Sequence, residues 1–227
     1  MVQIAVIGLG NFGFKLAKSL HDLGADVIAI DRKEDVIESI KDSVSQAIQM
    51  DATNENALRD IGISEVDAGV VAMGSNIEEN IMVTTLLRRM GVTRIISRAM
   101  TNLHEKILEE VGASKIIRIE EQMGDQVARW LVAPHVLQQV KFASGYSLVE
   151  LKPLKEFIGK TVSELNFREE YKVNIAALQK RMLSIDEDGK SIYKIETRSP
   201  PNPDDIVSED DILVLVGMDS AIYALTK

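Results

Sequence analysis

The sequence predicts an α/β chain with two parts: a Rossmann-like, doubly wound parallel sheet with a crossover helix, and a small α+β domain after it. Three observations predict this architecture. Short apolar runs alternate with helical patterns through about the first 133 residues, which is typical of a parallel sheet covered on both faces. A glycine-rich turn follows the first apolar run. From about residue 138 the alternation gives way to short strands and polar turns.

The glycine turn belongs to a strand–turn–helix–strand unit. Residues 2–7 form a mostly apolar run, a helical pattern begins at Phe14, and residues 25–30 predict a second strand that ends in Asp31. In a dinucleotide-binding unit, an acid at the end of this strand accepts hydrogen bonds from ribose hydroxyls.

The turn itself, Gly8–Gly13, has the spacing G-x-G-x-x-G. Gly8 would permit a tight turn, Gly10 would let the backbone approach a phosphate, and Gly13 would let helix and strand pack closely. The N–H groups and partial positive charge of the following helix favour a phosphate there. A purely structural turn is the alternative, but the strand, the helix and Asp31 together favour nucleotide binding.

The alternation then continues along the chain. We expect strands at 43–50, 68–72, 94–97 and 115–119, and helices at 35–40, 55–61, 102–111 and 120–133, with a long helix opened by residues 73–76. In such sheets ligands bind outside the carboxyl ends of the strands. We therefore expect one rim around a nucleotide, formed by the small and polar residues Gly8, Gly10, Asn11, Phe12, Gly13, Asp31, Arg32, Asp51, Ala52, Thr53, Ala72, Met73, Gly74, Ser75 and Asn76.

The predicted helix at 120–133 carries an apolar stripe with the chain's single tryptophan. Met123, Val127, Trp130 and Leu131 recur at helical spacing, and Pro134 ends the helix. The stripe either packs on its own domain or is offered to another subunit, because an exposed aromatic face needs covering.

The second part predicts a small α+β domain. We expect strands at 140–143, 147–151, 173–178 and 211–217, helices at 161–165 and 220–225, turns at 144–145 and 186–189, and a proline-rich loop at 200–205. The domain boundary is expected near residue 137, which gives domains 1–137 and 138–227.

Composition excludes several classes of protein. The chain has 227 residues, a formal net charge of −9 and no cysteine. The acidic balance argues against a nucleic-acid partner, and the lack of cysteine excludes disulfides and thiolate metal sites. No apolar run is long enough to span a bilayer and no signal peptide is recognisable, so a cytoplasmic location is expected.

Catalysis is not expected from these residues. An NAD-dependent oxidoreductase needs a proton donor or acceptor beside its substrate. The three histidines, His21, His104 and His135, are scattered and share no metal-ligand spacing. This alternative and that of a free-standing cytosolic nucleotide sensor stay open.

Taken together, the chain resembles the RCK (KTN) regulators of potassium transport, above all the soluble regulatory subunit of Ktr/Trk-type potassium uptake systems. The resemblance covers essentially the whole chain and rests on segments 6–13, 51–53, 117–124, 157–161 and 210–217. It implies binding of ATP, ADP or NAD(H) by the first domain. It also implies assembly through crossover helices into dimers and octameric rings, docked on the cytoplasmic side of a membrane-embedded potassium-translocating subunit.

The resemblance also implies roles for single residues. Glu120 would lie near the phosphates and hold a cation such as Mg²⁺, and Arg98 would face the same cleft; otherwise they are a helix-start acid and a surface arginine. Relatives often carry arginine at the position of Asn11, so its neutral side chain leaves room for NAD(H) beside ATP and ADP. In the second domain, cyclic di-AMP would bind near Asn174, Ile175 and Pro201, unless that region is an empty dimer interface.

Overall fold

The structure, a computed structural model, describes residues 1–74, 76–142, 144–185 and 191–225. Ser75 and the turn expected at 186–189 lie outside these residues. Internal contacts divide the chain into two compact units, residues 1–122 and 123–227. The division falls inside one helix, α6 (Ile119–Val132), and the domain boundary near residue 137 stays a prediction.

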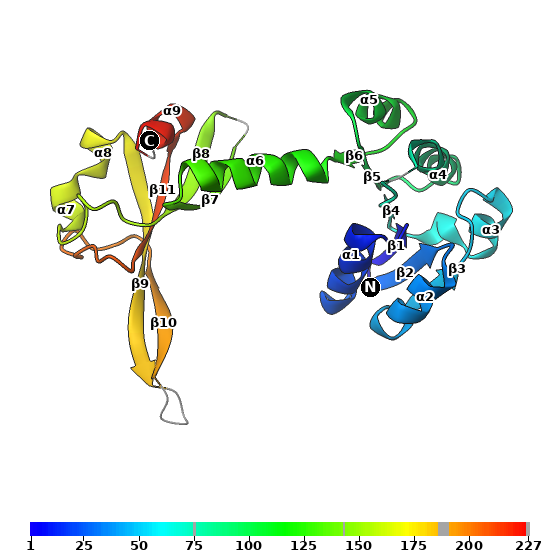
Figure 1. Cartoon of the computed structure of the whole chain (residues 1–227), viewed down its shortest axis with the longest axis horizontal. Coiled ribbons are helices and arrows are strands. Elements are labelled where there is room, and N and C mark those ends of the chain that lie inside the picture. The colour runs from blue at the N-terminus through cyan, green and yellow to red at the C-terminus, as the bar shows by residue number, and fades with distance from the viewer. Residues whose placement is uncertain (75, 143, 186–190, 226–227) are drawn as a thin grey trace. The chain divides into compact units, whose positions relative to one another are not determined.

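The first unit is a six-stranded parallel sheet with strand order β3-β2-β1-β4-β5-β6 (Figure 1). The order reverses between β1 and β4, which is the pattern of a doubly wound sheet, so the predicted fold class is confirmed. Its strands are β1 (Gln3–Ile7), β2 (Asp26–Asp31), β3 (Gln46–Gln49), β4 (Ala68–Val71), β5 (Ile95–Arg98) and β6 (Lys115–Ile117). Its helices are α1 (Asn11–Asp22), α2 (Glu34–Ile40), α3 (Glu55–Asp60), α4 (Ile77–Arg89) and α5 (Asn102–Glu110), and α6 begins here.

Apolar cores cover both faces of this sheet. In β1, Ala5 and Ile7 pack in one core cluster, whereas Val6 packs in another. Successive strand residues point to opposite faces, so a strand buried on both sides reads as one continuous apolar run. All four residues of β4 are buried for the same reason.

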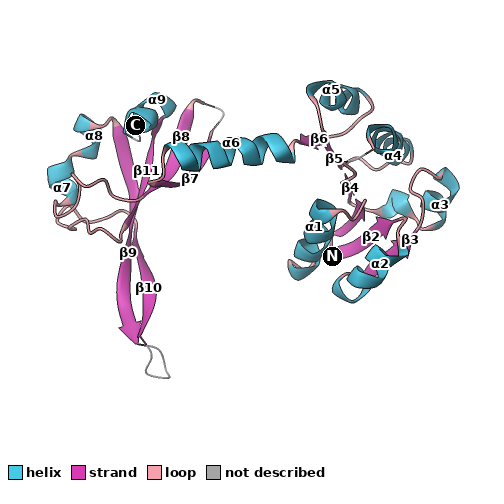
Figure 2. Ribbon diagram, in the orientation of Figure 1, coloured by secondary structure: helices cyan, strands magenta, loops and turns pink. Residues whose placement is uncertain are grey.

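The second unit contains a five-stranded antiparallel sheet with strand order β10-β9-β11-β8-β7. Figure 2 shows that strands dominate this unit, whereas helices and strands alternate in the first. Its strands are β7 (Val136–Lys141), β8 (Tyr146–Leu151), β9 (Val173–Ile185), β10 (Ser191–Arg198) and β11 (Ile212–Met218), and its short helices are α7 (Val162–Leu165), α8 (Phe167–Glu170) and α9 (Asp219–Leu225). Three rings pack together in its core, with Phe157 edge-on to both Phe167 and Tyr171.

The sequence analysis missed some elements of the second unit. It predicted neither β10 nor α8, and it started β7 four residues late and ended β9 seven residues early. The reason lies in burial. Tyr193 and Ile195 of β10 are both more than half exposed. This strand is joined to β9 by a backbone ladder, and its described side chains, residues 193–198, form no apolar core face.

The apolar stripe of α6 does not pack into a core of the described chain. Met123, Val127 and Trp130 are 50, 40 and 43% exposed, and Leu131 is 79% exposed. Separately, none of the described helices is long and apolar enough to cross a membrane.

Candidate nucleotide-binding site

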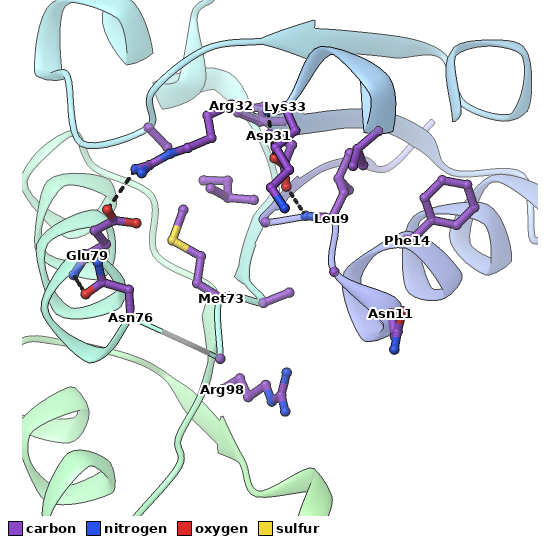
Figure 3. Close-up of a pocket in the computed structure, with 18 of the residues that line it drawn as sticks. Leu9, Asn11, Phe14, Asp31, Arg32, Lys33, Met73, Asn76, Glu79 and Arg98 are labelled. Atoms are coloured by element: carbon purple, nitrogen blue, oxygen red, sulfur yellow. Dashed lines mark hydrogen bonds and ion pairs between the residues drawn. The ribbon is translucent and has the colours of Figure 1, made fainter. Parts of the chain in front are cut away.

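An open cleft of about 960 Å³ lies at the carboxyl ends of the first unit's strands (Figure 3). It lies where the doubly wound topology places ligands. The structure brings these sequence-predicted residues to its lining: Gly8, Gly10, Asn11, Asp31, Arg32, Ala52, Ala72, Met73, Gly74, Asn76 and Arg98. It also lines the cleft with Phe14, Lys33, Val36, Ser39, Met50, Glu79 and Met100, which the sequence analysis did not propose.

Other sequence-predicted residues do not belong to this lining. Phe12 and Gly13 belong to the first turn of α1. Asp51 accepts hydrogen bonds from the N–H and hydroxyl of Thr53, at 2.9 and 2.7 Å. Those bonds lower the pKa of Asp51. Glu120 does not line the cleft but forms an ion pair with Arg98, which does.

The chain places different demands on the three glycines of the turn. Gly8 has a φ of +88°, in the left-handed region that favours glycine. A Cβ on Gly13 would lie 1.9 Å from the Gly8 carbonyl oxygen, so glycine is required for the helix to pack on the turn. A Cβ on Gly10, by contrast, would meet no atom of the chain within 4 Å. Nothing in the protein itself demands glycine there, and the free space adjoins the cleft.

The N-terminus of α1 has no side-chain cap. Gly10 is its N-cap, and its first turn carries no acidic residue. The N-termini of α4 and α5 are capped, by comparison. The side chain of Asn76 at the start of α4 and that of Thr101 at the start of α5 each accept a hydrogen bond from a backbone N–H of the first turn. The first N–H groups of a helix have no intrahelical acceptor, and together with the helix dipole they favour an anion. The α1 N-terminus, beside the open space at Gly10, therefore fits a phosphate.

Asp31, the last residue of β2, fixes the glycine turn. Its carboxylate accepts hydrogen bonds from the N–H groups of Leu9, at 2.7 Å, and Lys33, at 3.0 Å (Figure 3). Each carboxylate oxygen has a second lone pair. Asp31 can therefore hold the turn and still accept a hydrogen bond from a hydroxyl group of a ligand.

Arg32 spans one side of the cleft. Its guanidinium pairs with Glu79 at 2.9 Å and with Asp51 at 3.5 Å. The hydrogen bond to Glu79, followed by the charges of both acids, raises the pKa of Arg32. With two carboxylates as partners, its charge is already largely balanced within the protein.

Arg98, the last residue of β5, lies on the other side. Its side chain is 18% exposed and is pressed against Gly74, where a Cβ would lie 2.5 Å from Nη1. Nη2 pairs with Glu120, whereas the buried Nε–H has no acceptor in the described chain. The pKa of Glu120 is lowered, first by its own backbone N–H and then by Arg98.

Asn80 of α4 supports the cleft from behind, and the sequence analysis missed it. It is fully buried, and its side-chain amide donates to the carbonyls of Met73, at 2.8 Å, and Arg98, at 3.2 Å. It thereby ties together the ends of β4 and β5, which both line the cleft. The sequence does hint at this position, because Asn80 is an amide side chain at helical spacing from Val83, on the otherwise apolar face of α4.

A metal ion in the cleft would need a bound nucleotide to supply some of its coordinating atoms. Among the described residues, no group of three or more His, Asp or Glu side chains is placed to hold a cation. Glu120 could therefore supply only one ligand of a cation whose other ligands come from phosphate and water.

Comparison with known proteins establishes the family. A family model for the TrkA-N domain matches residues 4–119, and one for the TrkA-C domain matches residues 146–227. The Ktr system potassium uptake protein C of Bacillus subtilis is 32% identical over 99% of this chain and 96% of its own length. The Ktr system potassium uptake protein A of the same organism is 33% identical over 95% of this chain and 91% of its own length. The chain belongs to the TrkA-domain family of Ktr potassium uptake proteins.

A solved structure agrees with this fold. The GsuK channel bound to NAD matches 99% of this chain with a TM-score of 0.66 and 17% sequence identity. The match spans 38% of that longer chain. At this level of identity the likeness bears on the fold alone.

The TrkA-C domain contains a smaller cleft of about 340 Å³. It brings together Asn174, Ile175 and Pro201, the three residues singled out in the sequence, and adds Arg168 from α8. The Arg168 Nε donates to the Asn174 side-chain oxygen at 3.0 Å. A cation therefore lies on the rim of an otherwise mainly neutral cleft.

Proposed function

We propose that this TrkA-domain chain is the nucleotide-binding regulatory subunit of a potassium uptake system. The observation that carries the proposal is the free space at Gly10, between an uncapped helix N-terminus and Asp31, in a chain that matches Ktr proteins over nearly its whole length. A ligand can regulate without any reaction, because it favours whichever conformation binds it more tightly. The bound nucleotide would shift the subunit between two states and so control potassium flux.

The proposed ligand is ATP or ADP, with NAD(H) as the alternative. The α1 N-terminus would receive the phosphates and Asp31 the ribose. Because Asn11 carries no charge, we assign the discrimination between phosphate chains to Arg98, which lines the cleft together with Arg32 and Lys33. Mg²⁺ or another cation would be held between the phosphates and Glu120.

The proposed partners are a membrane-embedded potassium-translocating subunit and further copies of this chain. The exposed stripe of α6 supports self-association, first into dimers and then into a ring such as an octamer. Such a ring would lie in the cytoplasm, on the inner face of the membrane. In the TrkA-C domain, Arg168 could pair with a phosphate of cyclic di-AMP.

An oxidoreductase is the weaker alternative. His21 is exposed on α1, His104 is buried on α5, and neither these nor His135 lines the cleft. The cleft thus lacks the imidazole that most often transfers a proton beside a nicotinamide. A free-standing nucleotide sensor would use the same cleft and differ only in its partner.

Calorimetric titration of the purified chain with ATP, ADP, NADH and cyclic di-AMP, each with and without Mg²⁺, tests the proposal. We expect one adenine-nucleotide site per chain, with Mg²⁺ strengthening ATP more than ADP. Cyclic di-AMP should bind separately and without competition. Binding of NADH alone would favour the oxidoreductase, and hydride transfer would be assayed next. Failure of all four to bind would overturn the proposal.

A further inference from the structure

Arg98 faces the cleft and a helix at the same time. Its side chain lines the cleft beside Gly74, and Figure 3 shows it extending from β5 toward the side on which Asn11 begins α1. Its Nη2 is paired with Glu120 in the first turn of α6. The same guanidinium therefore connects the nucleotide cleft with the start of α6.

Two neighbouring ion pairs hold the first turn of α6. Glu120 pairs with Arg98, and Glu121 pairs with Arg118. Arg118 also pairs with Glu105 of α5, at 3.5 Å. Arg98 lines the cleft, whereas neither Arg118 nor its two acids does. One of the two ion pairs is therefore open to competition from a ligand in the cleft, and the other is not.

We infer that Arg98 exchanges Glu120 for an anionic phosphate when a nucleotide binds, and that this exchange releases the first turn of α6. The inference rests on the proposed function and adds to it a means of regulation. In the ligand-free chain Glu120 holds the guanidinium. In the bound chain without metal, the phosphate takes its place and the Glu120 carboxylate turns to water; with metal, the released carboxylate is free to hold the cation beside the phosphates.

The burial of the two partners favours such an exchange. Arg98 is 18% exposed, and its Nε–H has no acceptor, so its positive charge needs an anion and has a donor to spare. Glu120 is 58% exposed and loses little when water solvates it instead. A phosphate carries more negative charge than a carboxylate and accepts the paired N–H groups of a guanidinium. Arg32 is different, because two carboxylates hold it.

The exchange predicts a particular sign for the effect of removing Glu120. If Glu120 competes with the ligand, its loss strengthens nucleotide binding in the absence of metal. If Glu120 instead only helps to bind the ligand through a cation, its loss weakens binding with metal and changes nothing without it. Measurements in a chelator separate these two roles.

The test compares Glu120→Gln with the matched control Glu121→Gln, using calorimetric titration of ADP without metal. We expect Glu120→Gln to bind ADP about twofold to fivefold more tightly than the unaltered chain, the range expected for an exposed ion pair, and Glu121→Gln to bind unchanged. In the double variant Arg98→Gln/Glu120→Gln, affinity should equal that of Arg98→Gln alone, because the gain acts through Arg98.

Hydrogen exchange of residues 119–124 gives an independent measurement. ADP should increase exchange there in the unaltered chain, whereas Glu120→Gln should exchange faster without ligand and respond little to ADP. Equal or weaker ADP binding by Glu120→Gln would overturn the inference and leave the proposed function standing. Failure of the unaltered chain to bind any adenine nucleotide would overturn both.

Discussion

At the scale of single residues, the three glycines of the turn serve different purposes. Gly8 is required by its positive φ, and Gly13 by the contact that a side chain would make with the Gly8 carbonyl. Gly10 has a φ of −64°, which any residue adopts, and open space where a Cβ would be. Its lack of a side chain matters only when something else approaches. A substitution at Gly10 should therefore affect ligand binding without affecting folding.

Substituting alanine at Gly10 and Gly13 should have opposite consequences. Gly10→Ala should change the free energy of unfolding by no more than about 1 kcal/mol, yet lower ADP affinity by roughly tenfold or more, because its methyl group occupies the place of a phosphate. Gly13→Ala should destabilise the fold by about 1–3 kcal/mol or more, because backbone must move. Denaturant unfolding and calorimetric titration measure the two effects. Normal ADP affinity in Gly10→Ala would remove the phosphate from this position.

Most of the candidate site was predictable at this scale, because glycine spacing and an acid at a strand end follow from local backbone geometry. What the sequence does not reveal is which side chains meet. The contact of Arg98 with Gly74 and the hydrogen bond from Asn80 to the Arg98 carbonyl join residues 24 and 18 positions apart. Such contacts depend on how β4 and β5 pair, and periodicity along one segment does not contain that information.

At the scale of elements, α5 is joined to the cleft by a buried histidine. His104 is 2% exposed, its Nδ1 accepts the N–H of Met100 at 3.3 Å, and its Nε2 has no partner in the described chain. Met100 lines the cleft. Burial lowers the pKa of His104 below its usual 6.5. The neutral imidazole is therefore the form that supports the end of β5.

This burial predicts a loss of stability in mild acid. Below pH 6.5 the unfolded chain takes up a proton at His104 while the folded chain does not, so the unfolded state binds more protons. The free energy of unfolding should then fall as the pH drops from about 6.5 toward the lowered folded pKa, by up to about 1.4 kcal/mol per pH unit.

Urea unfolding at several pH values between about 5.5 and 7.5 measures this dependence. His104→Leu should have a shallower dependence on pH than the unaltered chain, whatever its absolute stability. Equal slopes in the unaltered chain and His104→Leu would show that His104 takes up its proton equally in both states.

The elements themselves divide into predictable and hidden ones. The central strands β1, β2 and β4 could be read from the sequence because the sheet is covered on both faces there, which makes their apolar runs nearly continuous. Strand β10 could not, because its exposed residues follow no core pattern and its pairing with β9 is made by backbone atoms. Residues that belong to a strand mainly through backbone pairing leave a weak signal in side-chain composition.

At the scale of the whole molecule, α6 is the element that a single chain leaves incomplete. None of its residues is buried, and Leu131 and Val132 are about four-fifths exposed, at 79 and 82%. A stripe of this kind on one helix is best covered by the same stripe on a second copy, since a twofold axis makes an interface complementary to itself. The helix also begins with Glu120, so assembly and nucleotide binding would act on one element.

Trp130→Ala should therefore weaken self-association, because the largest apolar side chain of the stripe is lost. Light scattering over a range of protein concentrations should give a lower mass than for the unaltered chain, with a shift of about tenfold or more in the concentration at which copies dissociate. Leu23→Ala is the matched control, because Leu23 is an exposed leucine (84%) just after α1 and does not belong to the stripe, and the mass of this variant should not change. An unchanged mass for Trp130→Ala would place self-association elsewhere. Adding ADP to the unaltered chain tests whether assembly and nucleotide binding are coupled. A ligand alters an equilibrium only by binding its two states unequally, so a shift in the dissociation concentration on adding ADP would show that the cleft and the α6 interface influence one another.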